Sequence, residues 1–125
     1  MMFPHLFSPA PVGRRSAANR FVSQAMEGND GEDGGRPSRR TLDRYLKLAR
    51  GGWGIVVVEA ISVTPDSLAR RNGLVMSERN LDAFRRLAGE YKKIFPGGLL
   101  FFQITHSGRH SGPFSRRTCL YPADA

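Results

Sequence analysis

The chain has 125 residues, enough for one domain with its own hydrophobic core. Hydrophobic residues make up 40% of it and charged residues 24%, as in ordinary soluble proteins, and no apolar run approaches the roughly 20 residues that cross a bilayer. The net charge is +8, but the basic residues are scattered in pairs, and the single cysteine excludes an internal disulfide and fits a reducing cytoplasm.

The first third of the chain predicts an irregular lead-in, a short strand and a long loop. Residues 3–20 contain several prolines and few apolar residues, which favours an extended or hairpin lead-in, with Phe7 tucked under the core. Phe21–Gln24 is a candidate strand. Residues 25–35 are rich in glycine and acidic residues, which predicts a loop.

A helix and the clearest strand of the chain follow. Ser38 is the expected N-cap of the helix, and Gly51-Gly52 its end. Trp53–Val58 is apolar on both faces and largely β-branched, which predicts a central strand, with Glu59 and Ala60 at its end. The apolar stripe of the helix consists of Leu42, Tyr45, Leu46 and Ala49.

The second half repeats this order of loop, helix and strand. Residues 61–72 are expected to form a loop, Ser77 to cap a second helix and 96–98 to end it, before a third strand over Leu99–Ile104. Polar residues that can bind a ligand follow that strand: Gln103, Thr105, His106 and Arg109. The helix presents an apolar face made of Leu81, Phe84, Leu87, Ala88, Tyr91 and Phe95.

The alternation of strands and helices predicts an α/β fold with a parallel sheet and right-handed crossovers. The long loops follow strands, whereas tight glycine turns connect helices to strands. This asymmetry is typical of a (β/α)8 TIM barrel, whose ligands bind in the loops after the strands. We expect a partial barrel over residues 1–125, with a lead-in at 1–20 and the first three βα units, three strands and two helices, at 21–125.

Four segments carry recognisable motifs. The first is Leu6–Pro9 together with Asn19–Val22, and the others are Gln24–Gly28, Gly51–Ala60 and Gln103–Arg109. In this order, they resemble the amino-terminal part of the Old Yellow Enzyme family of flavin-dependent NADH:flavin oxidoreductases and ene-reductases. Each motif is moderately specific, and their joint order is strongly specific.

The resemblance implies flavin mononucleotide (FMN) as cofactor, NADH or NADPH as reductant, and an activated alkene or similar small molecule as acceptor. It places Gln24, Ala25, Met26 and Glu27 beside the flavin ring through main-chain contacts. Core packing is an equal alternative for Met26. Ala60 would lie near the polar edge of the ring. Gln103 would hydrogen-bond its pyrimidine part, since an amide both donates and accepts.

Two positions depart from the family pattern. Ala25 stands where relatives usually have proline, and Glu27 where they often have a threonine or cysteine that tunes the flavin. A complete barrel needs about 250 residues, so we expect a fragment that is inactive by itself. It lacks the pair of residues, two histidines or a histidine and an asparagine, that anchors substrate on a later strand in the family. Catalytic residues therefore stay unassigned.

Other candidates have weaker support. His106 and His110 with Cys119 make a poor metal set, so we expect no metal, and His106 is a better structural residue than a catalyst. Arg109 suits either a carboxylate or a phosphate. Glu59 could be buried and paired, without a catalytic role. A small basic nucleic-acid-binding module is the alternative function, a truncated product without function is a third, and a homo-oligomer is compatible with all three.

Overall fold

The computed structural model describes residues 2–112, and its centre is a parallel sheet built on strand β4, Ile55–Ser62. Strand β6, Leu99–Thr105, pairs with β4 along its whole length. Because a strand has only two edges, two short strands share the other edge of β4: β3, Val22–Ser23, and β5, Leu74–Val75. All these pairings are parallel, as the sequence predicts.

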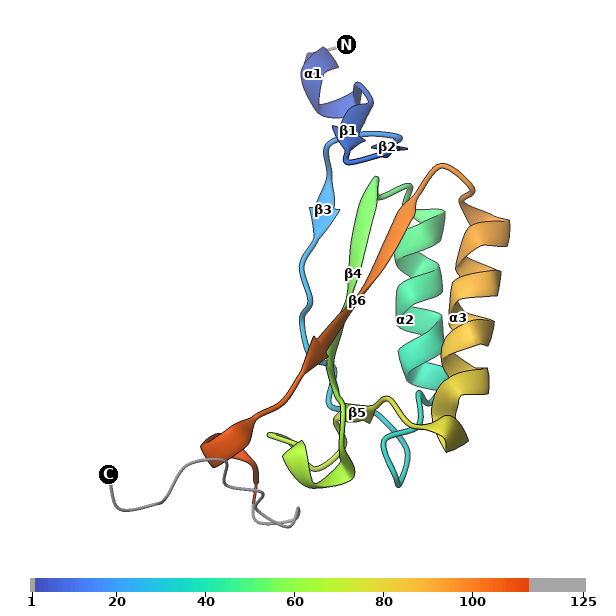
Figure 1. Ribbon diagram of the computed structural model, residues 1–125. Coiled ribbons are helices and arrows are strands. Elements are labelled where there is room, and N and C mark those ends of the chain that lie inside the picture. The colour runs from blue at the N-terminus through green and yellow to red at the C-terminus, as the bar shows by residue number, and fades with distance from the viewer. Residues whose placement is uncertain (1, 113–125) are drawn as a thin grey trace.

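Helices α2, Arg39–Arg50, and α3, Leu81–Ile94, lie side by side on one face of the sheet (Figure 1). The core lies between these helices and the sheet. It contains most of the predicted helical stripes, but neither Leu81 nor Ala88, together with Val56, Val58 and Ile61 of β4. Phe84 of α3 contacts Phe102 of β6 edge to face, with 6.0 Å between ring centroids. This two-layer packing gives the predicted α/β fragment.

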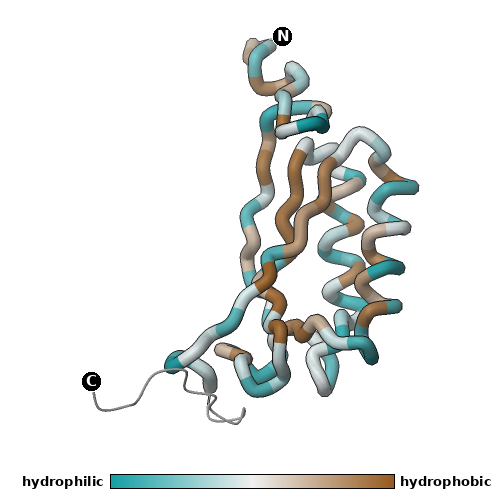
Figure 2. Tube along the Cα trace, viewed as in Figure 1, coloured by the Kyte–Doolittle hydropathy of each residue, from teal (hydrophilic) through white to brown (hydrophobic). Residues whose placement is uncertain are grey.

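The opposite face of the sheet carries no helix in the described part of the chain (Figure 1). Side chains alternate along a strand, so residues that neighbour the core positions point to this open face. They are largely apolar, as the brown strands in Figure 2 show, and Val22 and Phe101 are each 43% exposed. The sheet therefore resembles one wall of a barrel, with its inner surface uncovered.

The start of α2 agrees with the sequence down to its cap. The Ser38 side chain accepts a hydrogen bond from the backbone N–H of Thr41 at 3.1 Å, and the Thr41 hydroxyl accepts one from the backbone N–H of Ser38 at 3.2 Å. This reciprocal capping box satisfies two N–H groups that would otherwise lack partners. The helix ends at Gly51 and Gly52, as predicted, and Gly52 takes a positive φ of 71°.

The start of α3 differs from the prediction. The Ser77 side chain makes no capping hydrogen bond; a single 3₁₀ turn, Glu78–Asn80, precedes the helix, and Asn80 occupies the N-cap position. The Asn80 amide instead donates to the backbone carbonyls of Gly34 and Val75, at 2.9 and 3.0 Å. The expected cap was wrong because the buried Asn80 occupies the N-cap position and ties this corner to the loop after β3 and to strand β5.

The lead-in forms a short helix α1, Pro4–Phe7, and an antiparallel hairpin of β1, Ala10–Val12, and β2, Arg15–Ala17. Phe7 does not tuck under the core: it is 52% exposed, and its ring makes an edge contact with the ring of Phe21. Asn19 anchors the lead-in to the turn between α2 and β4. Its side chain accepts from the N–H of Gly54 at 2.8 Å and donates to the carbonyl of Gly52 at 2.7 Å.

Strand lengths are the main correction. β3 is shorter than the predicted strand over 21–24, whereas β4 continues to Ser62, so that Glu59 and Ala60 lie inside it. A bulge between Val58 and Ala60 accommodates Glu59 as an extra residue. The predicted loop over 61–72 therefore begins later, contains a 3₁₀ turn at Pro65–Ser67, and is followed by β5, which the sequence analysis missed. Within residues 2–112, no helix is long and apolar enough to cross a membrane.

The capping box yields a stability prediction. Replacing Ser38 by alanine removes the acceptor for the Thr41 N–H and should lower the free energy of unfolding by about 1 kcal/mol. Urea denaturation followed by circular dichroism measures this change. Ser16→Ala, at an exposed hairpin position, is the control and should leave the midpoint unchanged. Equal midpoints for both variants would contradict the role of the cap.

Candidate functional site

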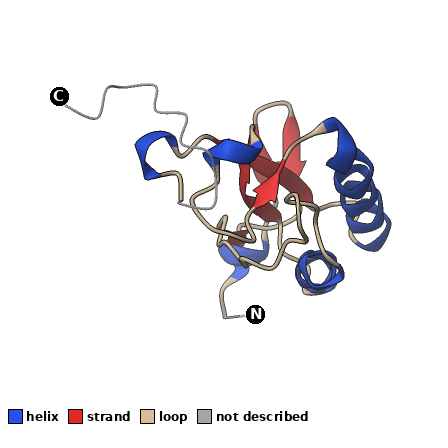
Figure 3. Cartoon of the chain, turned by 90° about the horizontal axis from the view of Figure 1, so that it is seen from below, coloured by secondary structure: helices blue, strands red, loops and turns tan. Residues whose placement is uncertain are grey.

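The carboxyl ends of β4 and β6 meet at one edge of the sheet, which Figure 3 shows from below. β3 ends earlier, opposite Val56, and the segment after it runs on to this edge, where Glu27 lines a small cavity with Ala60. All six residues predicted from the family resemblance lie at this edge or in the segment that follows β3. Ala60 and Gln103 are direct register partners in neighbouring strands. The Gln103 side chain is exposed and makes no hydrogen bond within residues 2–112. A small side chain and a free amide therefore lie next to each other on the open face.

The segment Gln24–Glu27 runs on from β3 without regular structure. The backbone N–H of Met26 donates to the carbonyl of Gln24 at 2.8 Å, which makes a tight local turn. Met26 is 76% exposed, so its side chain does not pack in the core formed by residues 2–112. Ala25 is partly exposed.

The Glu27 side chain is held by an ion pair with the guanidinium of Arg70, from the loop after β4. Both residues line a small cavity at the strand ends, together with Ala60, Ser62 and Thr105. The ion pair thus links the segment after β3 to the loop after β4 beside the predicted flavin position. The carboxylate does not stand there as an isolated charge.

Beneath this edge lies a buried carboxylate. The Glu59 side chain is 1% exposed and accepts three hydrogen bonds: from Arg44 Nη2 at 2.8 Å, from the Tyr45 hydroxyl at 3.1 Å and from the backbone N–H of Gly28 at 3.1 Å. The backbone N–H of Glu59 donates in turn to the Tyr45 hydroxyl at 2.8 Å. Glu59 is therefore buried and paired, as the sequence analysis considered.

Arg44 extends this network to the loop after β3. The same Nη2 donates to Asp30 at 2.8 Å, and the Thr41 hydroxyl also donates to that carboxylate at 2.8 Å. Burial by itself lowers the pKa of Arg44, but the hydrogen bond to Glu59 and the nearby acidic charges outweigh it, so the net shift is upward and the guanidinium stays charged. We call Asp30, Arg44, Tyr45 and Glu59 the buried clamp.

The residues after β6 take structural roles. His106 Nδ1 accepts a hydrogen bond from the backbone N–H of Gly108 at 3.0 Å, in agreement with the predicted structural role. Arg109 Nε lies 3.4 Å from His110 Nε2 and forms no ion pair within residues 2–112. In this same range, no three metal-ligating side chains come together, and Cys119 lies outside it.

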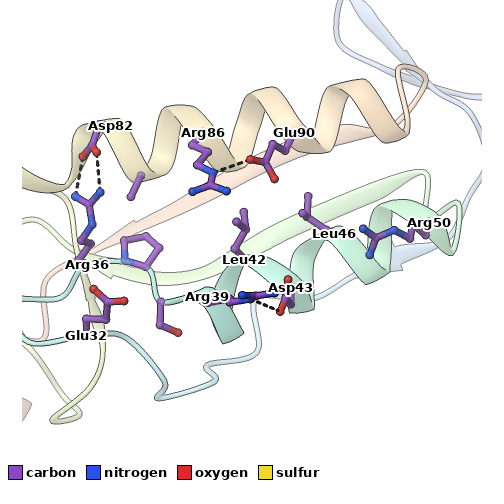
Figure 4. Close-up of a pocket in the computed structure, with 13 residues that line it drawn as sticks. Glu32, Arg36, Arg39, Leu42, Asp43, Leu46, Arg50, Asp82, Arg86 and Glu90 are labelled. Carbon is purple, nitrogen blue, oxygen red and sulfur yellow. Dashed lines mark hydrogen bonds and ion pairs between the residues drawn. The ribbon is translucent and has the colours of Figure 1, made fainter.

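A second hollow lies between α2 and α3, on the far side of the sheet from the open face (Figure 4). Its rim carries ion pairs that join Arg36 to Asp82, Arg39 to Asp43 and Arg86 to Glu90. Because these arginines already face carboxylates, the groove has little uncompensated positive charge for a phosphate backbone. It lies away from the strand ends and includes none of the six predicted site residues.

The sequence indicated the residues at this edge of the sheet but not the buried clamp that supports them. Arg44 and Asp30 had no signal of their own, since one lies on a helix rich in arginine and the other in an acidic loop. The run from Ile55 to Ser62 contains one carboxylate among apolar residues, and that isolated charge was the available hint of a buried ion pair.

Comparison with known proteins identifies the family. A sequence profile of the NADH:flavin oxidoreductase / NADH oxidase family matches residues 5–119. The NADH oxidase of Thermoanaerobacter brockii is 33% identical over 115 residues, which are 89% of this chain and 17% of that protein. The 4,4'-dithiodibutanoate disulfide reductase of Rhodococcus erythropolis is also 33% identical, over 92% of this chain and 28% of the relative.

Solved structures agree on the fold. The old yellow enzyme of Trypanosoma cruzi superimposes with a TM-score of 0.77 at 24% identity, over 90% of this chain and 30% of that one. The chain belongs to the NADH:flavin oxidoreductase / NADH oxidase family. It is similar to the first part of Old Yellow Enzyme-type TIM barrels and spans less than a third of the length of these relatives.

The clamp predicts a pH dependence at the alkaline end. Burial, with a further contribution from the Glu59 charge, raises the pKa of Tyr45 above its ordinary value of about 10. The unfolded chain therefore loses this proton first, and the free energy of unfolding should fall as the pH rises above about 10. Denaturation at several alkaline pH values measures the slope.

Tyr45→Phe tests the assignment of this slope. The variant should be less stable at neutral pH, because Glu59 loses a donor, yet it should show a shallower alkaline decline. Burial also raises the pKa of Tyr91, and this second shift accounts for part of the alkaline slope that remains in the variant. An unchanged slope would contradict the assignment to Tyr45.

Proposed function

We propose that this chain supplies the amino-terminal part of the flavin site of an FMN-dependent oxidoreductase, which uses NADH or NADPH to reduce an activated alkene or a similar small acceptor. The observation that carries the proposal is the shared carboxyl end of β4 and β6. Ala60 and Gln103 are register partners there, and Glu27, from the segment after β3, lines the same small cavity as Ala60. A reducing cytoplasm remains the compartment we expect.

The residues at this edge suit a flat heteroaromatic ring with a polar rim. Gln103 offers an amide donor and acceptor that no other side chain in residues 2–112 occupies. Its partner Ala60 is small, which leaves room for a ring to approach the sheet. The exposed backbone of Gln24–Glu27 can contact a ring at its side. FMN, when bound, supplies the hydride carrier between nicotinamide and acceptor.

The chain's own contribution is binding and orientation. The Gln103 amide would fix the ring in its plane, and the Glu27–Arg70 ion pair would leave a nearly neutral environment beside it. A neutral pair should disturb the electronics of a ring less than an unpaired carboxylate does, because its two charges largely cancel at a distance. The apolar face around Val57 and Phe101 would exclude water beneath the ring.

The uncovered face and open strand edges support the expectation that further barrel strands are needed for turnover. The nucleic-acid alternative rests on the net charge of +8 and on the scattered pairs of basic residues. The ion pairs that line the groove beside α2 and α3 already compensate three of its arginines, which favours the flavin proposal.

FMN titration tests the proposal. The chain is mixed with the remaining barrel segment of the Rhodococcus erythropolis relative, and flavin binding is followed by fluorescence quenching and by the visible absorbance spectrum. We expect one FMN per complex. Gln103→Ala should weaken binding about fivefold to tenfold, because one net hydrogen bond contributes about 1 kcal/mol.

Glu90→Gln provides the matched control. This residue lies on α3, on the other side of the sheet from Gln103, and within residues 2–112 it pairs only with Arg86. Its FMN affinity should equal that of the unchanged chain. Absence of flavin binding by the complemented chain would refute the proposed function, and equal affinities for Gln103→Ala and the control would refute the role of Gln103.

A further inference from the structure

The buried clamp binds the residues that directly follow the segment expected to contact the flavin. Glu59 reaches that segment from the bulge of β4, where its side chain points toward α2 rather than toward the open face. The Glu59 carboxylate accepts a hydrogen bond from the backbone N–H of Gly28, the residue that follows Glu27. One buried carboxylate thus connects the central strand, a helix and the loop after β3.

The segment Gln24–Glu27 is fixed at both ends. Before it, β3 pairs with β4 through Val22 and Ser23. After it, the Gly28 amide is bound to Glu59, and Asp30 is bound to Arg44 and Thr41. Four residues between two fixed points have few backbone conformations available, so the clamp restricts where this segment can lie.

Gly28 supplies an independent observation. A Cβ atom added at Gly28 would collide with the guanidinium group of Arg44. That group cannot swing aside freely, because it is bound to two carboxylates. The backbone of the loop therefore packs directly against the clamp, and a side chain at position 28 would force them apart.

Stability alone is a poor reason for such an arrangement. Removing charges from water is unfavourable, and well-packed apolar residues often replace a buried ion pair without loss. Arg44 Nε is also buried without a hydrogen-bond partner in the described residues. The desolvation of this network is unfavourable, but its hydrogen bonds are directional. The network is therefore suited to fixing the position of the loop.

We infer that Glu59 and Arg44 are positioning residues. Through their hydrogen bonds to Gly28 and Asp30, they set the conformation of the strand-end segment Gln24–Glu27. The inference deepens the proposed function, because the segment matters as a wall of the flavin site. The clamp touches none of the reacting atoms; it acts through the backbone of the loop.

Hydrogen exchange of the full chain, without flavin, tests the positional part. In Glu59→Gln, the amide exchange of Gly28 and its neighbours should accelerate at least tenfold relative to that of the β4–β6 ladder. Asp82→Ala is the matched control, since it removes another arginine–carboxylate pair that joins the same loop to the helical layer. It should leave Gly28 exchange unchanged.

Gly28→Ala is the second variant, chosen because it leaves every charge in place. It should displace Arg44 and reproduce the local acceleration, even if Glu59→Gln fails to fold. Uniform acceleration over the whole sheet in either variant would mean a merely structural role and would overturn the inference. So would an equal effect of Asp82→Ala at Gly28.

Flavin affinity tests the functional part. In the complemented chain, Glu59→Gln and Gly28→Ala should raise the FMN dissociation constant about tenfold, whereas Glu90→Gln, which removes an ion pair on α3, should not change it. Unchanged affinity in the clamp variants would overturn the functional part. If the unchanged chain binds no FMN, the proposed function fails, and the exchange measurements still decide whether the clamp positions the segment.

Discussion

The parallel pairing of β4 with its neighbours is the constraint on which the rest of the structure depends. β6 occupies one edge of β4 completely, and β3 and β5 divide the other between them. Parallel pairing brings the carboxyl ends of β4 and β6 to the same edge, so residues far apart in sequence become neighbours. The two helices then have only one face to cover, because right-handed crossovers place both on the same side.

This geometry separates an outer layer from an inner face. Buried apolar side chains and the clamp lie toward the helices, whereas Val22, Phe101 and Gln103 lie on the open side. The chain spans less than a third of the relatives it matches, and in a closed barrel further strands would cover such a face. The exposed apolar wall and the exposed polar strand ends thus have one cause, the uncovered inner surface.

The ionic contacts of the chain differ greatly in what surrounds them. The pair between Arg36 and Asp82 is exposed and screened by water, so its contribution to stability is small. Glu59 is almost fully buried, and its charge is tolerable only because three donors converge on it. Burial makes the second arrangement rigid and directional, which is the property a cofactor-binding loop requires.

The sequence by itself determined the order of strands and helices, their parallel arrangement, the cap at Ser38 and the family, because hydrophobic periodicity, glycine turns and ordered motifs are local signals. It also located Ala60 and Gln103 near strand ends. Only the tertiary structure decided that these two are register partners, that Glu59 lies in a bulge and that Met26 is exposed. The short β5 and the clamp escaped prediction because both depend on contacts between residues distant in the chain, which no local pattern encodes.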